Sequence, residues 1–322
     1  MTSRIKDYIR LPGVQNIVSF SGGKDSTAIY LQALKWGLKF RAVLFDTGNE
    51  HEITLDYSRQ ISARTGGPDV EIRKADFSAK FERKRQTMRE KWPVDGVPQE
   101  RIDRALELFH PTGNPFLDMV MLKGRFPASQ SRFCTDELKV LPMMFQVTLP
   151  ALRNGPVVNW HGVRAQESKH RATYIRFARC DSGAAIWRPI HHWTHEQVFA
   201  LHSEFGIEPN PLYKMGMGRV GCMPCIMARK SEIMEIAQRF PEHIERIAEW
   251  ERIVSEVSKR GNGTFFAEGT APYTDGYDPE KEGYYDIHQI VAWSKTSRGG
   301  RQMSMDYTDK GSACSSRYGL CE

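Results

Sequence analysis

The sequence predicts an α/β fold with a doubly wound parallel sheet and a mostly helical C-terminal extension. Three observations predict it. Short apolar runs of strand length alternate with segments of helical periodicity, the alternation begins near the N-terminus, and a glycine-rich turn joins the first strand to the first helix. Strands joined through helices lie parallel because each connection must cross back over the sheet, so the helices cover both sheet faces.

The first strand is expected at residues 16–20, and it leads into a helix over residues 26–36 that ends at Gly37. The helix after the second strand ends at residues 66–68 (GGP), because neither glycine nor proline favours a continuing helix. Further strands are expected at 41–45, 70–73 and 157–160, and further helices at 53–64, 78–110 and 194–205.

The chain changes character after Cys225 and becomes mostly helical. Pro241 suits the first turn of a helix, and the residues after it carry one apolar stripe. We therefore predict a first domain of residues 1–230 and a helical extension of residues 231–322, which ends in a polar tail with two cysteines. In the extension we expect helices at 231–240, 241–260 and 287–293, and a long ordered loop at 261–285.

Composition excludes several classes of protein. Of the 322 residues, 40% are apolar and 26% are charged, which argues against disorder. No stretch approaches the ~18 apolar residues of a membrane helix, and residues 1–10 hold no apolar signal region, so we expect a soluble, cytoplasmic protein without a membrane partner. The net charge of 45 − 39 = +6 is compatible with an anionic partner, including nucleotides or nucleic acid. Six cysteines are too few for a disulfide scaffold and favour metal or redox chemistry.

The most specific motif is the glycine loop, residues 19–27 (SFSGGKDST), between the first strand and the first helix. Two glycines let the backbone approach a phosphate, the helix start supplies free N–H groups, and a lysine adds positive charge. The loop differs from a Walker loop, which needs glycine where Val18 stands and a hydroxyl residue where Asp25 stands. The expected phosphate-binding residues are Ser19, Ser21, Gly22, Gly23, Lys24, Asp25 and Ser26.

A carboxylate, Asp46, stands at the end of the second predicted strand, in the segment 46–50 (DTGNE). The carboxyl ends of parallel strands meet at one edge of a sheet, so Asp46 is expected near the glycine loop. There it could bind a ribose hydroxyl or a magnesium ion. The alternative is a cap for the helix that starts near Ile53.

The glycine loop resembles the SGGxDS signature of the PP-loop ATP pyrophosphatases. Three later stretches narrow the resemblance: 132–139 (RFCTDELK), 162–168 (GVRAQES) and the segment 188–225, which ends in GCMPC. Together they resemble the phosphoadenosine phosphosulfate (PAPS) reductase family over roughly residues 15–230. The complete loop and the cysteine pattern look more like the ATP-using members related to DNA phosphorothioation enzymes.

The resemblance implies a nucleotide-binding fold and an enzyme that acts on ATP, adenosine 5′-phosphosulfate (APS) or PAPS at the α-phosphate side. The preferred function is ATP pyrophosphatase or adenylylation chemistry with Mg²⁺, coupled to sulfur transfer from a donor protein. One alternative is an APS or PAPS reductase that forms sulfite with a thioredoxin-like reductant. Another is a non-catalytic subunit that binds nucleotide or nucleic acid and carries a structural metal cluster. The implied catalytic residues are Lys24, Asp25, Asp46 and Arg164, and the implied additional nucleotide-binding residues are Arg132, Lys139, Gly162 and Arg171.

The cysteines indicate a metal or redox site. The pair Cys222 and Cys225 has a spacing that suits zinc, an iron–sulfur cluster or dithiol chemistry. In APS reductases, to which the chain is similar, a Cys-Cys pair and a Cys-x-x-Cys pair hold a four-iron cluster; Cys134 matches the start of the first pair, but Thr135 replaces its neighbour. We therefore expect a 4Fe–4S cluster, with zinc, a sulfur-carrying thiol or inert cysteines as alternatives. The expected metal ligands are Cys134, Cys222, Cys225 and, from the tail, Cys314 or Cys321, while Cys180 is expected to be a buried packing residue.

Overall fold

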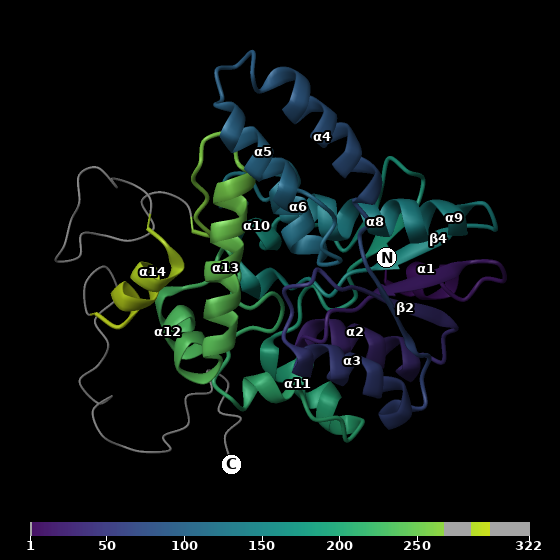
Figure 1. Ribbon diagram of the computed structural model, residues 1–322. Helices are drawn as coiled ribbons and strands as arrows, with labels where there is room; N and C mark the ends of the chain where they lie inside the picture. Colours follow the sequence, from purple (N-terminus) through teal and green to yellow (C-terminus); the bar gives the residue numbers. More distant parts are fainter. Residues whose placement is uncertain (1, 267–284, 297–322) are drawn as a thin grey trace.

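A computed structural model describes residues 2–266 and 285–296 and contains one six-stranded sheet in the order β3-β2-β1-β4-β6-β5 (Figure 1). The first five strands of this order are parallel and β5 is antiparallel, so the predicted doubly wound sheet is confirmed. The strands are β1 (Gln15–Ser19), β2 (Phe40–Phe45), β3 (Val70–Arg73), β4 (Val157–Trp160), β5 (Phe177–Arg179) and β6 (Ala185–Trp187).

The centre of the sheet is the point where the strand order reverses. The chain moves from β1 outward through β2 to β3, and then returns to the other side of β1 with β4. Ile17 of β1 pairs with Arg41 on one side and with Asn159 on the other. In doubly wound sheets, ligands bind in the crevice at the carboxyl end of the strands where this reversal occurs. The fold therefore places the glycine loop at the expected ligand position.

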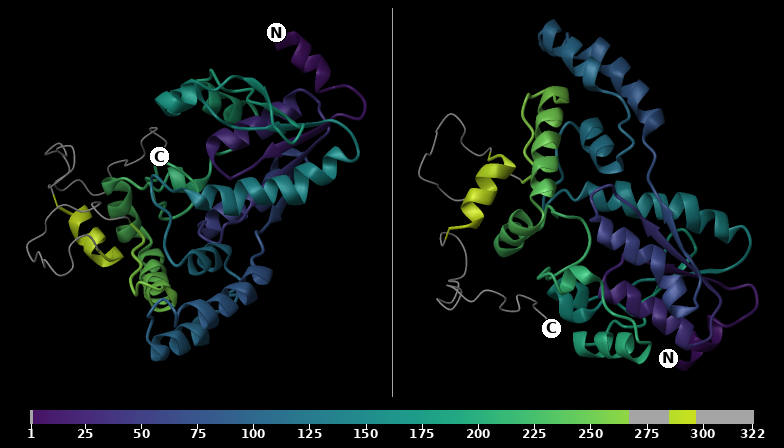
Figure 2. Two further views of the ribbon diagram at one scale, coloured as in Figure 1. Left: turned by 90° about the horizontal axis from the view of Figure 1, so that it is seen from above. Right: turned by 60° about the horizontal axis from the view of Figure 1, so that its bottom comes forward.

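Helices cover both faces of the sheet, because alternate strand residues point to opposite faces. Val18 joins a core with α2 (Lys24–Lys35), α3 (Glu52–Thr65) and α11 (His195–Glu204). Ile17 joins a smaller core on the other face, under a helical segment that combines α-helical and π-helical turns (Figure 2). That segment is made of α7 (Phe133–Thr135), a π-turn at Asp136–Val140, α8 (Leu141–Met143), a π-turn at Met144–Thr148 and α9 (Leu149–Leu152).

The third and largest core lies beside the sheet and joins helices that are far apart in the sequence (Figure 1). In it the ring of Phe116 stacks on that of Trp250, with centroids 5.3 Å apart. Helices from both sides of residue 230 share this core; the division into domains at that residue stays a prediction. The helices of this core are α4 (Ser78–Lys91), α5 (Gln99–Leu108), α6 (Pro115–Lys123), α12 (Lys230–Arg239), α13 (Pro241–Val257) and α14 (Ile287–Ser294).

The predicted elements agree with the structure except where local signals compete. The helix expected over residues 78–110 is two helices, α4 and α5, because Pro93, Gly96 and Pro98 interrupt it. α6, the helical segment 133–152 and the β5–β6 hairpin were not expected. Most of the expected ordered loop at 261–285 lies outside the described residues. The remaining elements are α1 (Thr2–Tyr8), α10 (Lys169–Ala172) and two 3₁₀ turns at Ala165–Glu167 and Pro211–Tyr213.

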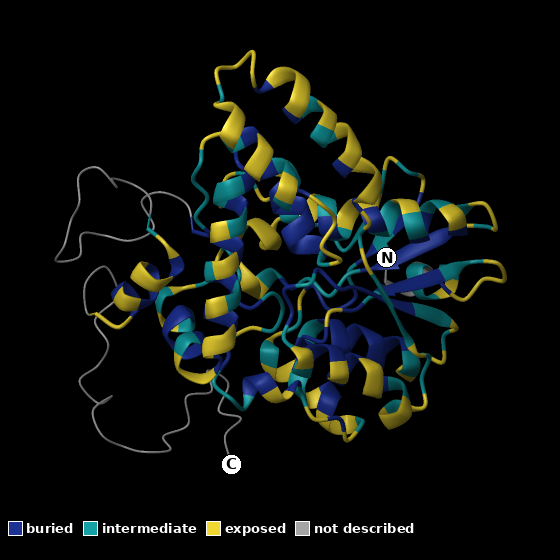
Figure 3. Cartoon of the chain, viewed as in Figure 1, coloured by how far each residue is buried: buried dark blue, intermediate teal, exposed yellow. Residues whose placement is uncertain are grey.

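Side-chain burial differs between the helices that cover the sheet and those beside it. Most side chains of α2 are buried, whereas most of those of α4 are exposed (Figure 3). Within the described residues, no helix has both the length and the apolar character to cross a membrane.

A buried carboxylate, Glu251 of α13, fixes the chain on either side of the undescribed segment 267–284. Its oxygens accept the backbone N–H groups of Phe265, at 2.7 Å, and Ile287, at 2.9 Å. Burial nevertheless raises the pKa of Glu251 to about 7, above the ordinary value of 4.5. The charged form is therefore less favourable in the folded than in the unfolded protein.

This pKa predicts a pH-dependent stability. A folded pKa above the unfolded one gives a contribution that is complete below pH 4.5 and is lost as the pH rises through about 7. We expect the difference in free energy of unfolding, wild type minus Glu251→Gln, to fall across that window. Other groups titrate in both proteins and cancel in the difference. Denaturation with urea at several pH values measures it, and a difference that is flat or rises with pH contradicts the assignment.

Candidate functional site

The glycine loop turns sharply between β1 and α2 and depends on glycine at one position. Gly22 has a φ of +69°, a left-handed conformation that other residues rarely adopt. It also packs against α3: a Cβ at Gly22 would stand 2.7 Å from Cγ2 of Thr54 and 3.1 Å from Oγ of Ser58. The neighbouring Gly23 has room for a Cβ, since its nearest neighbour, Oη of Tyr213, is 3.5 Å away. The loop conformation is therefore fixed mainly by Gly22.

The loop leaves backbone N–H groups without acceptors at the start of α2. The hydroxyl of Ser26 donates to the carbonyl of Gly23 and accepts from the amide of Ser21, and Thr27 also bonds to Gly23. Unpaired amides at a helix N-terminus, together with the helix dipole, form a binding site for an anion. The amides without a protein acceptor in the described part of the chain are those of Gly22, Gly23, Asp25 and Ser26.

Three side chains from residues 202–213 form hydrogen bonds with the backbone of the glycine loop. Sequence reasoning assigned none of them a role. The amide of Lys24 donates to Oη of Tyr213 at 3.1 Å. His202 of α11 lies 2.9 Å from the carbonyl of Lys24, and Asn210 donates to the carbonyl of Gly22 at 3.2 Å. All three side chains are buried. Asn210 and Tyr213 lie within the segment 188–225 that contributes to the family resemblance, and the structure shows that both bond to the loop.

Two predicted catalytic cations converge on Asp25. Lys24 Nζ lies 3.0 Å from Oδ2 of Asp25, and Nε of Arg164 lies 2.5 Å from Oδ1. Lys24 and Arg164 are only 6% and 4% exposed. Arg164 follows β4, the strand next to β1, so the sheet order itself brings it to the loop. The result is a buried cation–carboxylate–cation network at the mouth of the anion site.

Gly162 reaches the same place by backbone contact. A Cβ there would stand 2.8 Å from the carbonyl oxygen and 2.9 Å from the carbonyl carbon of Asp25. Only a residue without a side chain lets the end of β4 approach the start of α2 so closely. The described contacts therefore give Gly162 a packing role beside the anion site, and direct nucleotide binding by it stays a prediction.

Asp46 lies at the same edge of the sheet, at the end of β2, and is buried. One oxygen accepts the amide of Gly48 at 2.8 Å, and the other pairs with Lys74 at 3.2 Å. The alternative role as a cap for α3 is wrong: Nδ1 of His51 accepts the amide of Ile53 and caps that helix instead.

The remaining anion-binding candidates are less tightly placed. Ser19 is the last residue of β1. Arg171 is exposed and pairs with Glu167, and Arg132 is exposed at the start of α7. Neither arginine contacts the glycine loop in the described residues. Lys139, also expected at the nucleotide, lies instead beside Glu50 and the cysteines.

The candidate metal site brings three of the predicted ligands into one neighbourhood. Cys134, Cys222 and Cys225 all act electrostatically on Lys139, and Cys222 is the strongest of the influences that raise the pKa of its ammonium group. Burial raises the pKa of the Cys222 thiol to about 12, and Lys139 opposes that shift. The hydroxyl of Thr47 lies 3.6 Å from Sγ of Cys222. The other predicted ligands, Cys314 and Cys321, lie outside the described residues.

Glu50 is a residue of this site that sequence reasoning did not assign. It is 8% exposed, and its Oε2 accepts the amide and the hydroxyl of Thr47 at 2.8 and 2.7 Å. Its Oε1 lies 3.8 Å from both Sγ of Cys222 and Nζ of Lys139. Its position in the segment 46–50, next to a strand end, was the available signal. Glu50 therefore joins the carboxyl edge of the sheet directly to residues 221–225 (GCMPC), which we call the cysteine loop.

The spacing of the thiols bears on which metal group they fit. A single zinc ion with bonds of about 2.3 Å draws its sulfur ligands to within about 4 Å of one another. In the described residues, only His51, Glu242 and His243 form a group of three ligand atoms as close as 4.8 Å. In that group His51 uses its Nδ1 lone pair for the amide of Ile53, so its neutral ring has no second lone pair for a metal. Cys134, Cys222 and Cys225 do not form such a close group in the described residues. Cys180, expected to be buried, is half-buried just after β5.

The cysteine loop is held from the helical extension. Arg246 of α13 donates to Oδ1 of Asn49 at 2.8 Å and to the carbonyl of Met223 at 2.9 Å. Asn49 in turn bonds to the carbonyl of Pro224 at 2.9 Å and to the amide of Met223 at 2.7 Å. Arg246 therefore joins α13, the end of β2 and the cysteine loop.

This arrangement predicts that Arg246 limits access to Cys222. In an Arg246→Ala variant the loop loses two hydrogen bonds, and we expect labelling of Cys222 by a thiol reagent at pH 8 to accelerate by about tenfold, the equivalent of about 1.4 kcal/mol. Mass spectrometry of labelled peptides follows Cys222 separately from the other thiols. Arg252→Ala, at an exposed residue of the same helix, is the control. Equal labelling rates in the two variants would falsify the coupling.

Comparison with known proteins agrees with this geometry. The family model described as the phosphoadenosine phosphosulfate reductase domain matches residues 15–228. An uncharacterized 37.8 kDa protein of Escherichia phage 186 is 46% identical over 95% of this chain and 96% of its own length. The adenosine 5′-phosphosulfate reductase of Neisseria meningitidis is 29% identical over 39% of this chain and 53% of its own.

Among solved structures, the PAPS reductase of Candida auris covers 68% of this chain and 85% of its own, with 17% identity and a TM-score of 0.41. The match of the family model spans most of the described fold, including the glycine loop and all three cysteines of the candidate metal site. The chain belongs to the phosphoadenosine phosphosulfate reductase domain family.

Proposed function

We propose that this protein is an ATP-using enzyme that cleaves ATP between the α- and β-phosphates and couples this step to sulfur transfer. The observation that carries the proposal is the row of amides without acceptors at Gly22, Gly23, Asp25 and Ser26, beside the buried cation Lys24. Such a row binds an anion of several oxygens, and pyrophosphate supplies them.

The chemistry follows from this placement. An acceptor oxygen attacks the α-phosphorus, a new P–O bond forms, and the bond between the α-phosphorus and the bridging oxygen breaks. Pyrophosphate leaves with the electron pair, and the loop amides and Lys24 stabilise its charge. Asp25 and Arg164 keep Lys24 oriented. Asp46 and Asp25 are the carboxylates that would hold Mg²⁺, which would supply further charge neutralisation.

In this proposal the cysteines carry the sulfur chemistry. Cys134, Cys222 and Cys225 would hold an iron–sulfur cluster, with Cys314 or Cys321 as the fourth ligand. The cluster would hold the sulfur site in place. After the acceptor oxygen has been adenylylated, a sulfur nucleophile from the donor would bond to the atom that carries this oxygen, and AMP would leave with the oxygen and the electron pair. A sulfur-donor protein is the partner that this reaction requires. Glu50 lies beside Cys222 and Lys139 at the carboxyl edge of the sheet, which supports the idea that the thiols and the glycine loop take part in the same reaction.

The decisive experiment uses anaerobically purified, iron-replete protein. Pyrophosphate release from ATP is measured beside sulfite release from APS and PAPS, with wild type and Asp25→Asn. We expect pyrophosphate release that Asp25→Asn abolishes, because Lys24 and Arg164 lose their common partner. A protein that binds no nucleotide and releases neither product overturns the enzyme assignment. Nucleotide binding without turnover indicates the non-catalytic alternative.

Sulfite release would instead favour a second candidate function, an APS or PAPS reductase. The similarity to the Neisseria meningitidis enzyme supports it. There a thiolate attacks the sulfur of the phosphosulfate, an S–S bond forms, and the nucleotide leaves as a phosphate. A second thiol then releases sulfite and forms a disulfide, which a thioredoxin-like protein reduces.

Iron content tests the ligand set independently. We expect a brown protein with absorption near 400 nm, about the range of thiolate-ligated clusters. Either Cys314→Ala or Cys321→Ala should lose iron, whereas Cys180→Ala should retain it. Full iron content in both tail variants removes the tail from the ligand set, and a colourless protein with one equivalent of zinc replaces the cluster with zinc.

A further inference from the structure

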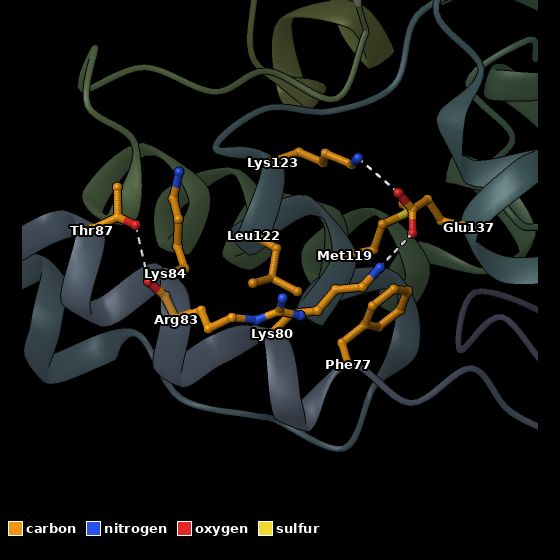
Figure 4. A pocket seen from close by; sticks show the side chains of 9 residues that line it. All are labelled: Phe77, Lys80, Arg83, Lys84, Thr87, Met119, Leu122, Lys123 and Glu137. Carbon is orange, nitrogen blue, oxygen red and sulfur yellow. Dashed lines mark hydrogen bonds and ion pairs between the residues drawn. The ribbon is translucent and has the colours of Figure 1, made fainter.

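A pocket away from the glycine loop lies between α4, α6 and the π-turn Asp136–Val140. Its volume is about 350 Å³. Figure 4 shows Glu137 on one side, and Lys84 and Thr87 on the other. The function proposed above leaves this pocket unused. We name it the cationic pocket, and its lining residues are Phe77, Lys80, Arg83, Lys84, Thr87, Met119, Leu122, Lys123 and Glu137.

The pocket has more positive than negative charge. Four basic side chains and one carboxylate line it. Glu137 pairs with both Lys80, at 2.9 Å, and Lys123, at 2.8 Å. Arg83 and Lys84 have no carboxylate partner in the described part of the chain, and burial lowers the pKa of Lys84. A half-buried cation without a counter-ion is costly, and an anionic ligand would remove that cost.

Two cations of α4 outside the pocket are already engaged. Arg85 donates to the carbonyls of Leu106 and Phe109, at 2.7 and 2.6 Å. Arg89 lies 3.7 Å from Glu82. Over its length α4 carries six basic and two acidic residues, 6 − 2 = +4. Part of this surplus positive charge lies where Arg83 and Lys84 line the pocket.

The rest of the lining is apolar. Phe77, Met119 and Leu122 contribute to the wall, and Phe77 and Met119 are buried in the core below. The ammonium group of Lys80 lies 5.0 Å from the ring centroid of Phe77. A ligand that fits therefore combines an anionic group, whose several oxygens can reach both cations, with an attached group that packs on the apolar wall. The carboxylate of a peptide side chain has only two oxygens and no such group attached to it.

We propose that the cationic pocket binds a phosphorylated nucleoside, with its phosphate on Arg83 and Lys84 and its sugar and base over the apolar wall. Arginine suits a phosphate because its forked donors match two oxygens, and lysine adds a point charge. The nucleotide is either free or one unit of a single strand, and both forms share this chemistry. The site stands on its own contacts and does not require that the glycine loop be catalytic.

The test uses the full-length protein without ATP, because ATP is itself a phosphorylated nucleoside and would compete for the cationic pocket; the Lys24→Ala variant described below accounts for binding at the glycine loop. Fluorescence anisotropy of a labelled 12-nucleotide single-stranded DNA gives the dissociation constant, and calorimetric titration with AMP tests the free nucleotide. In the double variant Arg83→Ala, Lys84→Ala we expect the affinity for at least one probe to fall about tenfold or more. For the strand, the slope of log K against log salt should decrease by about 0.7, because the two side chains share one phosphate.

The matched control is Arg89→Ala with Arg104→Ala, which removes two exposed cations that already pair with glutamates. It should bind like wild type. The proposal is overturned if both double variants bind alike, if neither probe binds wild type, or if a poly-glutamate peptide displaces the probe as well as unlabelled probe does. Unchanged probe binding in Lys24→Ala, measured without ATP, separates this site from the glycine loop, whose proposed function can then fail without affecting it.

Discussion

Replacing Arg164 with alanine is expected to lower the free energy of unfolding by about 3 kcal/mol and to abolish turnover. Arg164 is 4% exposed, and its Nε lies 2.5 Å from Asp25. Removing one partner of a buried ion pair leaves the other charge poorly compensated, which costs about 3–5 kcal/mol. The lower end is expected because Asp25 keeps Lys24, at 3.0 Å. Lys24 is then held more tightly by Asp25 and stabilises the phosphate less, so nucleotide affinity should fall as well.

Two variants make this result specific. Arg171→Ala removes an arginine that also pairs with a glutamate but is exposed, so its cost should stay within about 1 kcal/mol. Arg164→Lys keeps the charge but loses the planar guanidinium, so it should recover part of the stability and little of the turnover. Urea denaturation and pyrophosphate release measure the two quantities. If Arg164→Ala behaved like Arg171→Ala, the buried network would have no energetic role.

Replacing Gly22 with alanine is the second large change. The left-handed conformation costs a residue with a side chain about 1–3 kcal/mol, and the added methyl group would meet Thr54 at 2.7 Å. Overpacking adds about 1–3 kcal/mol. We expect a total loss of about 2–6 kcal/mol in free energy of unfolding, and loss of nucleotide binding because the amide of Gly22 moves.

Gly13→Ala separates these two causes. Gly13 also has a positive φ, +83°, but no atom lies within 4 Å of the position a Cβ would take. It should show the conformational cost alone, about 1 kcal/mol, and should bind nucleotide normally. Thermal and urea unfolding give the stabilities, and calorimetry with ATP gives the affinities. Equal losses in both variants would mean that the contact with Thr54 does not matter.

Local patterns predicted the strands closely. The strands expected at 70–73 and 157–160 agree residue for residue with β3 and β4, because a buried parallel strand is a short apolar run with clear ends. The segment 133–152 was missed because its helix contains two π-turns and two prolines, which break the regular apolar spacing that identifies a helix. The hairpin β5–β6 was missed because its strands have three residues each.

The candidate site also consists of parts that local sequence patterns predicted and parts that they did not. The sequence by itself determined the glycine loop, since its turn, its free amides and its charge belong to consecutive residues and follow from local chemistry. It also identified Arg164 and the three cysteines, through motifs whose spacing resembles a known family. Only the tertiary structure decided which distant residues complete these parts. Tyr213 bonds to the glycine loop, Glu50 lies next to Cys222, and Arg246 bonds to the cysteine loop. The physical reason is that a buried polar group needs a partner, and packing chooses that partner from anywhere in the chain.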